Sequence, residues 1–158
     1  MRYEQRTHTV NEQGLRGFAS ASDREAEDRA AAILEAKWDC KLHRYEPFDS
    51  IDWYASRNGL TIAFVELKAR SHQSGTFPTV YLNFRKYLTL MLAWQSTGKK
   101  CVFVVQFRDQ LRGINVLDID ATRLPVLGCR NRVKSPLDIE PVIEVPVSSM
   151  KVISEGGS

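Results

Sequence analysis

Cysteine is scarce in this chain. Three cysteines, at positions 40, 101 and 129, are spread over 158 residues. An odd number at such wide spacing, without a C-x-x-C or Cys/His pattern, excludes a disulfide framework and a zinc site of the usual kind. The three histidines are also isolated from one another in the sequence, and we assign them no role.

Long apolar runs are missing as well. Every run is far shorter than the roughly 20 residues of a membrane helix. The opening residues MRYEQRTHTVNEQG contain no apolar core of a signal peptide. We therefore expect a cytoplasmic protein without a membrane partner. The length suits one domain, which we place at residues 21–153, between a flexible arm (1–20) and a flexible tail (154–158).

Acidic residues are rare in the middle of the chain. Residues 67–134 hold twelve Lys or Arg and three Asp or Glu, a net charge of +9, whereas the whole chain carries only +3. Such a block is typical of a surface that follows nucleic-acid phosphates. It can equally be a solvated face with no ligand, and the sequence does not decide between the two.

The periodicity of apolar residues predicts a mixed α/β fold. Helices are expected at 22–38 and within 80–99, because apolar residues there recur with helical spacing. The second helix gives the chain enough length for a parallel crossover between strands. The strands are expected at 40–45, 50–56, 60–69, 101–107 and 114–119, with a further short strand at 142–145 in a loop-rich remainder.

The stretch IAFVELKAR, residues 62–70, places two charges inside an otherwise apolar strand. Because side chains alternate between faces, Glu66 and Lys68 share one face. Whether Asp52 joins them on that face depends on the turn near residues 57–59, which connects its strand to the strand of Glu66. A two-residue Asn58-Gly59 turn with regular pairing puts Asp52 on the other face. We expect instead a three-residue loop, 57–59, with Gly59 left-handed in a bulge, which pairs Asp52 with Phe64 and brings it to Glu66.

Two carboxylates and an ammonium on one face favour a site for a hard divalent cation. Mg²⁺ takes carboxylate and carbonyl oxygens, retains several waters and binds phosphate oxygens. Such a cation stabilises charge in phosphodiester hydrolysis, and an ammonium beside it can hold the attacking water.

The order of these residues resembles the PD-(D/E)xK nuclease superfamily, in particular its small Holliday-junction-resolvase-like members. Glu27 resembles the helix acid of that superfamily, Asp52 the hairpin acid, and Glu66-Leu67-Lys68 the (Asp/Glu)-x-Lys motif. The resemblance implies a restriction-endonuclease-like core of order α-β-β-β-α-β-β, with a mixed central β-sheet flanked by helices. It also implies metal ligation by Asp52, Glu66 and the carbonyl of Leu67, with Glu27 assisting, and water activation by Lys68.

A further polar residue from the second helix is also implied by the resemblance. Lys86 is our candidate, and Tyr81 is the alternative. The proline of the family motif is absent, since Ile51 precedes Asp52, and Asp49 remains an alternative hairpin ligand. The residues that we expect to contact nucleic acid are Arg70, Arg85, Lys86, Lys99 and Lys100.

These features together predict an Mg²⁺-dependent nuclease in which Mn²⁺ substitutes. Because no separate specificity domain is visible, we expect a structure-directed DNA endonuclease, with DNA preferred to RNA. Two symmetric cuts require two active sites, which favours a homodimer. Two other readings stay open: a nucleic-acid-binding module on the same fold that does not cut, and a protein-interaction domain.

Overall fold

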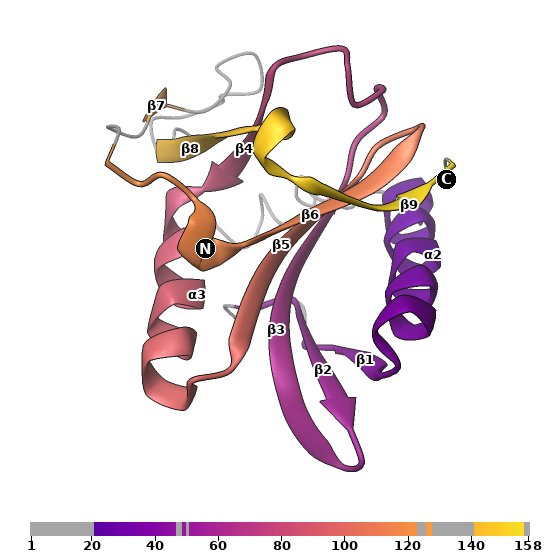
Figure 1. Ribbon diagram of the computed structural model, residues 1–158, viewed down its shortest axis with the longest axis vertical. Helices are drawn as coiled ribbons and strands as arrows, with labels where there is room; N and C mark the ends of the chain where they lie inside the picture. The colour runs from indigo at the N-terminus through magenta and orange to yellow at the C-terminus, as the bar shows by residue number, and fades with distance from the viewer. Residues whose placement is uncertain (1–20, 47–48, 50, 123–125, 128–140, 157–158) are drawn as a thin grey trace, which may run out of the picture.

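A computed structural model describes residues 21–46, 49, 51–122, 126–127 and 141–156. Figure 1 shows a twisted sheet with one helix on each side and a smaller sheet beside the second helix. None of the helices in these ranges is long and apolar enough to cross a membrane. The predicted arm at 1–20 lies outside the described residues.

The two main helices are α2 (Ala21–Trp38) and α3 (Phe84–Thr97), and short 3₁₀ turns are η1 (Val116–Asp118) and η4 (Val147–Ser149). The strands are β1 (Lys41–Arg44), β2 (Trp53–Arg57), β3 (Leu60–Ala69), β4 (Thr79–Asn83), β5 (Lys100–Gln106), β6 (Gln110–Asn115), β7 (Val126–Leu127), β8 (Pro141–Pro146) and β9 (Lys151–Glu155). The predicted helix–strand–strand–strand–helix–strand order is confirmed up to β5, apart from the insertion of β4.

The larger sheet has the strand order β1-β2-β3-β5-β6-β9. Only its central pair, β3 and β5, runs parallel, and the chain between them passes through β4 and α3. The parallel crossover predicted from the sequence is therefore confirmed. A second sheet, of order β4-β8-β7, packs beside α3.

Each face of the larger sheet has its own apolar core. Alternate residues of β5 point to opposite faces, with Phe103 packing towards α3 and Val104 towards α2. On β3, Phe64 packs with the α3 core, while Val65 and Leu67 are buried in the α2 core. Glu66 and Lys68 share the pleat of Phe64, so these two charges lie on the face that α3 covers.

Local signals fix the limits of α3. The side chain of Asn83 accepts hydrogen bonds from the backbone N–H groups of Arg85 and Lys86, which have no partner within the helix. At the other end Gly98 takes a left-handed φ of 71° and donates its N–H to the carbonyl of Trp94. This cap at Asn83 holds Lys86 in the first turn, next to the sheet.

The predicted loop of the β2–β3 hairpin is wrong, although its consequence for the fold is right. Arg57 pairs with Leu60, so the turn has two residues, and both Asn58 (φ 53°) and Gly59 (φ 78°) are left-handed. The register then shifts at Ala55, which leaves Ile62 as an extra residue in β3. This bulge inside the strand, rather than a bulge in the turn, brings Asp52 round to the Glu66 face.

Three other boundaries differ from the prediction. Residues 79–83 form β4, paired with β8, and the helix starts only at Phe84. The strand expected at 114–119 runs from Gln110 to Asn115, through Gly113, whose missing Cβ would lie 2.9 Å from Ile153 Cδ1. The β9 strand continues to Glu155, so the domain end placed after residue 153 falls within a strand.

Candidate active site

Glu66 is the centre of the candidate site. It is 1% exposed, although a carboxylate is strongly hydrated in water. Neither of its side-chain oxygens has a hydrogen-bond partner among the described residues. A buried and unsatisfied carboxylate is costly, and in a native fold it calls for a functional explanation.

Two ammonium groups lie near the Glu66 carboxylate. Lys68 Nζ is 3.3 Å from Glu66 Oε2, and Lys86 Nζ is 3.6 Å from Glu66 Oε1. Lys86 also donates a 2.8 Å hydrogen bond to Oδ1 of Asp52. The Lys86 ammonium thus bridges the two carboxylates, from a helix that the cap at Asn83 positions.

Burial and neighbouring charges shift the pKa values of these groups in different directions. Burial raises the pKa of Glu66 to about 7, against the opposing pull of Lys68. At Asp52 burial also acts to raise the pKa, but Lys86 and Lys68 outweigh it, and the pKa is lowered. The Glu66 carboxylate raises the pKa of Lys68. Near neutral pH the site therefore holds a charged Lys68 beside a Glu66 carboxyl group that is protonated in only a part of the molecules.

Glu27 approaches from α2 and is held by a residue that the sequence did not single out. Arg44 of β1 pairs with Glu27 at 3.2 Å and with Asp28 at 2.8 Å, and its guanidinium lies 4.3 Å from the centre of the Trp53 ring. Burial raises the pKa of Glu27, which Lys68 opposes. No sequence signal marks Arg44, because its position beside α2 depends on how the edge strand packs.

Some of the predicted site residues come together in space, and others do not. Asp52, Glu66, Lys68 and Lys86 come together, and Leu67 lies between two of them with its side chain buried in the α2 core. The carboxylate of Asp49, the alternative hairpin ligand, instead accepts a hydrogen bond from the backbone N–H of Glu46. Tyr81 is exposed on β4.

The residues predicted to contact nucleic acid are also divided. Arg70 follows β3 two residues after Lys68, and its charge acts on that lysine. Arg85 precedes Lys86 in the first turn of α3. Lys99 and Lys100 lie instead at the start of β5, where Lys100 pairs with Ala63 while Glu66 pairs with Phe103. The basic block of the sequence is therefore not one surface.

The donor set suits a hard cation only in part. Within the described ranges no three Asp, Glu, His or Cys side chains converge to hold a metal. Glu27 is thus not a third ligand beside Asp52 and Glu66 in this arrangement. Mg²⁺, however, is commonly held by one or two carboxylates, with water and substrate oxygens completing its shell. The unsatisfied oxygens of Glu66 next to Asp52 fit that requirement.

The mixed sheet, its flanking helices and this group of side chains define a restriction-endonuclease-like protein. Residues 16–153 match the family described as "Phage putative PDDEXK endonuclease", and the chain belongs to that family. Membership supports cleavage of nucleic acid by this chain, and it confirms the superfamily that the sequence motifs indicate. No curated protein matches the chain.

Two solved structures share the fold. One is Hjc, a Holliday junction resolvase of Archaeoglobus fulgidus, with a TM-score of 0.51 and 16% identity over 80% of this chain and 93% of the other. The second is D212, a nuclease from a fusselovirus, with a TM-score of 0.50 and 14% identity over 86% of this chain and 89% of the other. At such low identity these likenesses bear on the fold alone.

Proposed function

We propose that the chain is an Mg²⁺-dependent DNA endonuclease that recognises the shape of a branched substrate. One observation carries the proposal: the buried Glu66 carboxylate, whose two oxygens have no hydrogen-bond partner among the described residues, faces Asp52 and Lys68 on one side of the sheet. A salt bridge on a wet surface would not require a buried acid.

Asp52 and Glu66 are the side chains that would hold the cation, with the carbonyl of Leu67. When bound, Mg²⁺ supplies positive charge opposite the phosphate and lowers the pKa of a coordinated water. Mn²⁺ should substitute, because it also accepts oxygen ligands. A cation that binds both carboxylates must compete with the Lys86 ammonium, which makes ion pairs with the same two groups.

Lys68 is the residue that we assign to the attacking water. The Glu66 carboxylate raises the pKa of Lys68, and Glu27 adds to this effect, so Lys68 is an ammonium at neutral pH. It therefore positions the water and stabilises charge on the phosphate, rather than removing a proton. Glu27 acts as a positioning residue through this charge and through Arg44.

Support for DNA as the substrate is less direct. The family is one of phage endonucleases, and one structural neighbour is a Holliday junction resolvase. Arg70 and Arg85 flank the acidic pair and can contact phosphates beside the scissile bond.

We propose that cutting both strands of a junction uses two copies of the chain. On α3, Leu88 is 49% exposed and Leu92 is 62% exposed, an apolar surface that favours such a homodimer.

A cleavage panel tests the proposal. Fluorescent duplex, flap, four-way-junction and single-stranded DNA, with a matching RNA junction, would be incubated with Mg²⁺, with Ca²⁺ or with EDTA. We expect cuts in branched DNA with Mg²⁺, binding without cutting with Ca²⁺, and no cuts with EDTA. Binding without cleavage under all metal conditions would favour the non-cleaving module, and no salt-dependent binding would favour a protein-interaction domain.

A further inference from the structure

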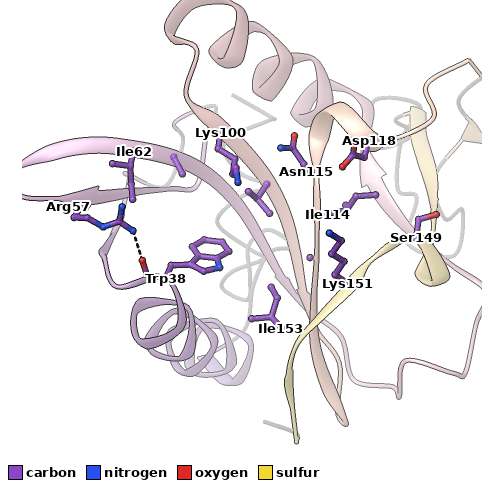
Figure 2. Close-up of a pocket in the computed structure, with 13 residues that line it drawn as sticks. Trp38, Arg57, Ile62, Lys100, Ile114, Asn115, Asp118, Ser149, Lys151 and Ile153 are labelled. Carbon is purple, nitrogen blue, oxygen red and sulfur yellow. Dashed lines mark hydrogen bonds between the residues drawn. The ribbon is translucent and has the colours of Figure 1, made fainter.

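A cavity of about 610 Å³ lies on the opposite face of the sheet from Glu66. It opens between the end of α2 and strands β6 and β9, as Figure 2 shows. Its floor includes Ala63 and Val102, at the start of the parallel pair. Glu66 lies three residues further along β3, about 10 Å away at the rise of a strand. The cavity is therefore separate from the candidate active site.

The charges around this cavity are mostly positive. Arg57, Lys100 and Lys151 line it, and Asp118 is the one acid in its lining. The Arg57 guanidinium is fixed, because it donates hydrogen bonds to the carbonyls of Trp38 and Asp39. Lys100 and Lys151 make no ion pair with any described residue, and they enter the cavity from different strands (Figure 2). Two such ammonium groups favour an anionic ligand.

The remaining walls are apolar, with a few polar groups. The half-buried indole of Trp38 lies at the end of α2, facing the space between the helix and β9 (Figure 2). Ile62, the extra residue of the β3 bulge, and Ile153 extend this apolar surface. Asn115 and Ser149 add neutral hydrogen-bonding groups. The volume lies within the range of small-molecule sites, about 300–1,000 Å³.

We propose that this cavity binds a nucleotide unit. Lys100 and Lys151 receive the phosphate, and the flat base packs against the Trp38 indole. An aromatic ring beside basic side chains is how proteins bind single nucleotides of an unpaired strand, and stacking contributes about 1–3 kcal/mol per base. A duplex does not fit this role, because its bases are stacked inside and cannot enter a cavity.

The unit has two sources with the same chemistry: a free nucleotide, or an unpaired nucleotide within a strand. Because the cavity and the Glu66 site lie on opposite faces, one nucleotide cannot occupy both. The cavity therefore affects the affinity for the nucleotide-containing ligand and not the chemical step of cleavage at the Glu66 site. This inference does not depend on the proposed nuclease function, since binding can be measured without metal.

The test measures binding in EDTA, using dAMP, deoxyadenosine and a hexamer of deoxyadenylate. Calorimetry would compare the parent protein with Lys100→Gln/Lys151→Gln and with a matched control, Lys37→Gln/Lys41→Gln. The control removes two exposed lysines that do not line the cavity. We expect at least one phosphate-bearing ligand to bind saturably, at least tenfold more weakly to the first variant and unchanged to the control. Deoxyadenosine, which lacks the phosphate, should bind at least tenfold more weakly than the phosphate-bearing ligand that binds.

Nuclear magnetic resonance supplies the location. The indole N–H signal of Trp38, assigned with Trp38→Phe, should shift on titration, whereas those of Trp53 and Trp94 should not. Tighter binding of the hexamer than of dAMP identifies a nucleotide within a strand, and binding of dAMP at least as tight as that of the hexamer identifies a free nucleotide. Any of three results would overturn the proposal: equal losses of affinity in both double variants, a Trp38 signal that does not shift, or no saturable binding of either dAMP or the hexamer.

Discussion

Two groups of charged side chains lie on opposite faces of one sheet and differ in how their charges are matched. Around Glu66 each ammonium is paired with a carboxylate at 2.8–3.6 Å, and the acid is buried. Around the cavity Lys100 and Lys151 have no described ion-pair partner, and Asp118 is the one acid in the lining. A matched and buried group is suited to chemistry, because its geometry is fixed. An unmatched and open group is suited to holding an anion.

The largest expected contrast between the two groups concerns cleavage. Lys68→Ala should lower the single-turnover cleavage rate by about 10²–10³-fold, the range for a group that stabilises charge developing in the transition state. Lys100→Gln should leave that rate within about twofold under saturating enzyme. Substrate affinity, measured with Ca²⁺, should change little in Lys68→Ala. Similar losses of rate in both variants would remove the distinction between the two regions.

A second contrast concerns stability and pH in the absence of divalent cations. Glu66 has a pKa raised to about 7, from an ordinary value of 4.5. The folded state thus binds a proton more tightly than the unfolded state, and this group's contribution to stability is lost as pH rises from about 4.5 to 7. Glu66→Gln should remove that loss and raise the free energy of unfolding at pH 8 by up to about 3 kcal/mol.

Urea unfolding at pH 5 and pH 8 with EDTA would measure this effect. Ser149→Ala, at the cavity, serves as the control because it changes no titratable group. A Glu66→Gln variant less stable than the parent at pH 8 would show that the ion pairs with Lys68 and Lys86 outweigh the cost of burial.

Lys86 gives a third and smaller contrast. Because its ammonium contacts both carboxylates, Lys86→Gln should bind Mn²⁺ several-fold more tightly than the parent in the absence of substrate. Lys100→Gln should not change the affinity for Mn²⁺, since Lys100 lies at the end of β5 that is far from the two carboxylates. Electron paramagnetic resonance of free Mn²⁺ would measure both. Weaker Mn²⁺ binding by Lys86→Gln would mean that Lys86 organises the carboxylates instead of competing for them.

The smallest effect concerns the phosphate footprint near the site. Arg70→Gln/Arg85→Gln should reduce the slope of log affinity against log salt by about two for duplex DNA, because each basic residue displaces about one counterion. The cleavage rate at saturation should change little. An unchanged slope, measured by fluorescence anisotropy, would show that these arginines face solvent or protein in the complex.

The sequence predicted which residues meet at the site better than it predicted how they meet. Glu66 and Lys68 share a face by strand alternation alone, and the Asn58-Gly59 pair correctly marked a hairpin. The position of the bulge, where Ile62 is the extra residue opposite the Ala55–Ser56 step, was not predictable, because no local sequence signal marks it. Asp52 thus reached the expected face through a different register.

Helix packing and charge placement were predicted less well. On α3 the apolar residues permit a stripe through Leu88 and Leu92 or one through Leu90 and Trp94. In the structure Leu88 and Leu92 are exposed, whereas Leu90 is buried and Trp94 packs against the core. Apolar spacing around that helix permits either stripe, and only the tertiary contacts choose one. Lys100 follows Arg85 and Lys86 in the basic block, but α3 carries the chain to the opposite end of the sheet before β5 begins.

The most direct test is single-turnover cleavage of a four-way DNA junction at pH 8 with Mg²⁺, by the parent and by Glu66→Gln. Circular dichroism would confirm that both are folded. We expect cleavage by the parent and a loss of at least about 10²-fold in the variant, because a neutral amide is a poor ligand for a hard cation. Cleavage by Glu66→Gln at the parental rate would contradict this expectation, and Glu66 would then be a buried partner of two lysines without a catalytic role.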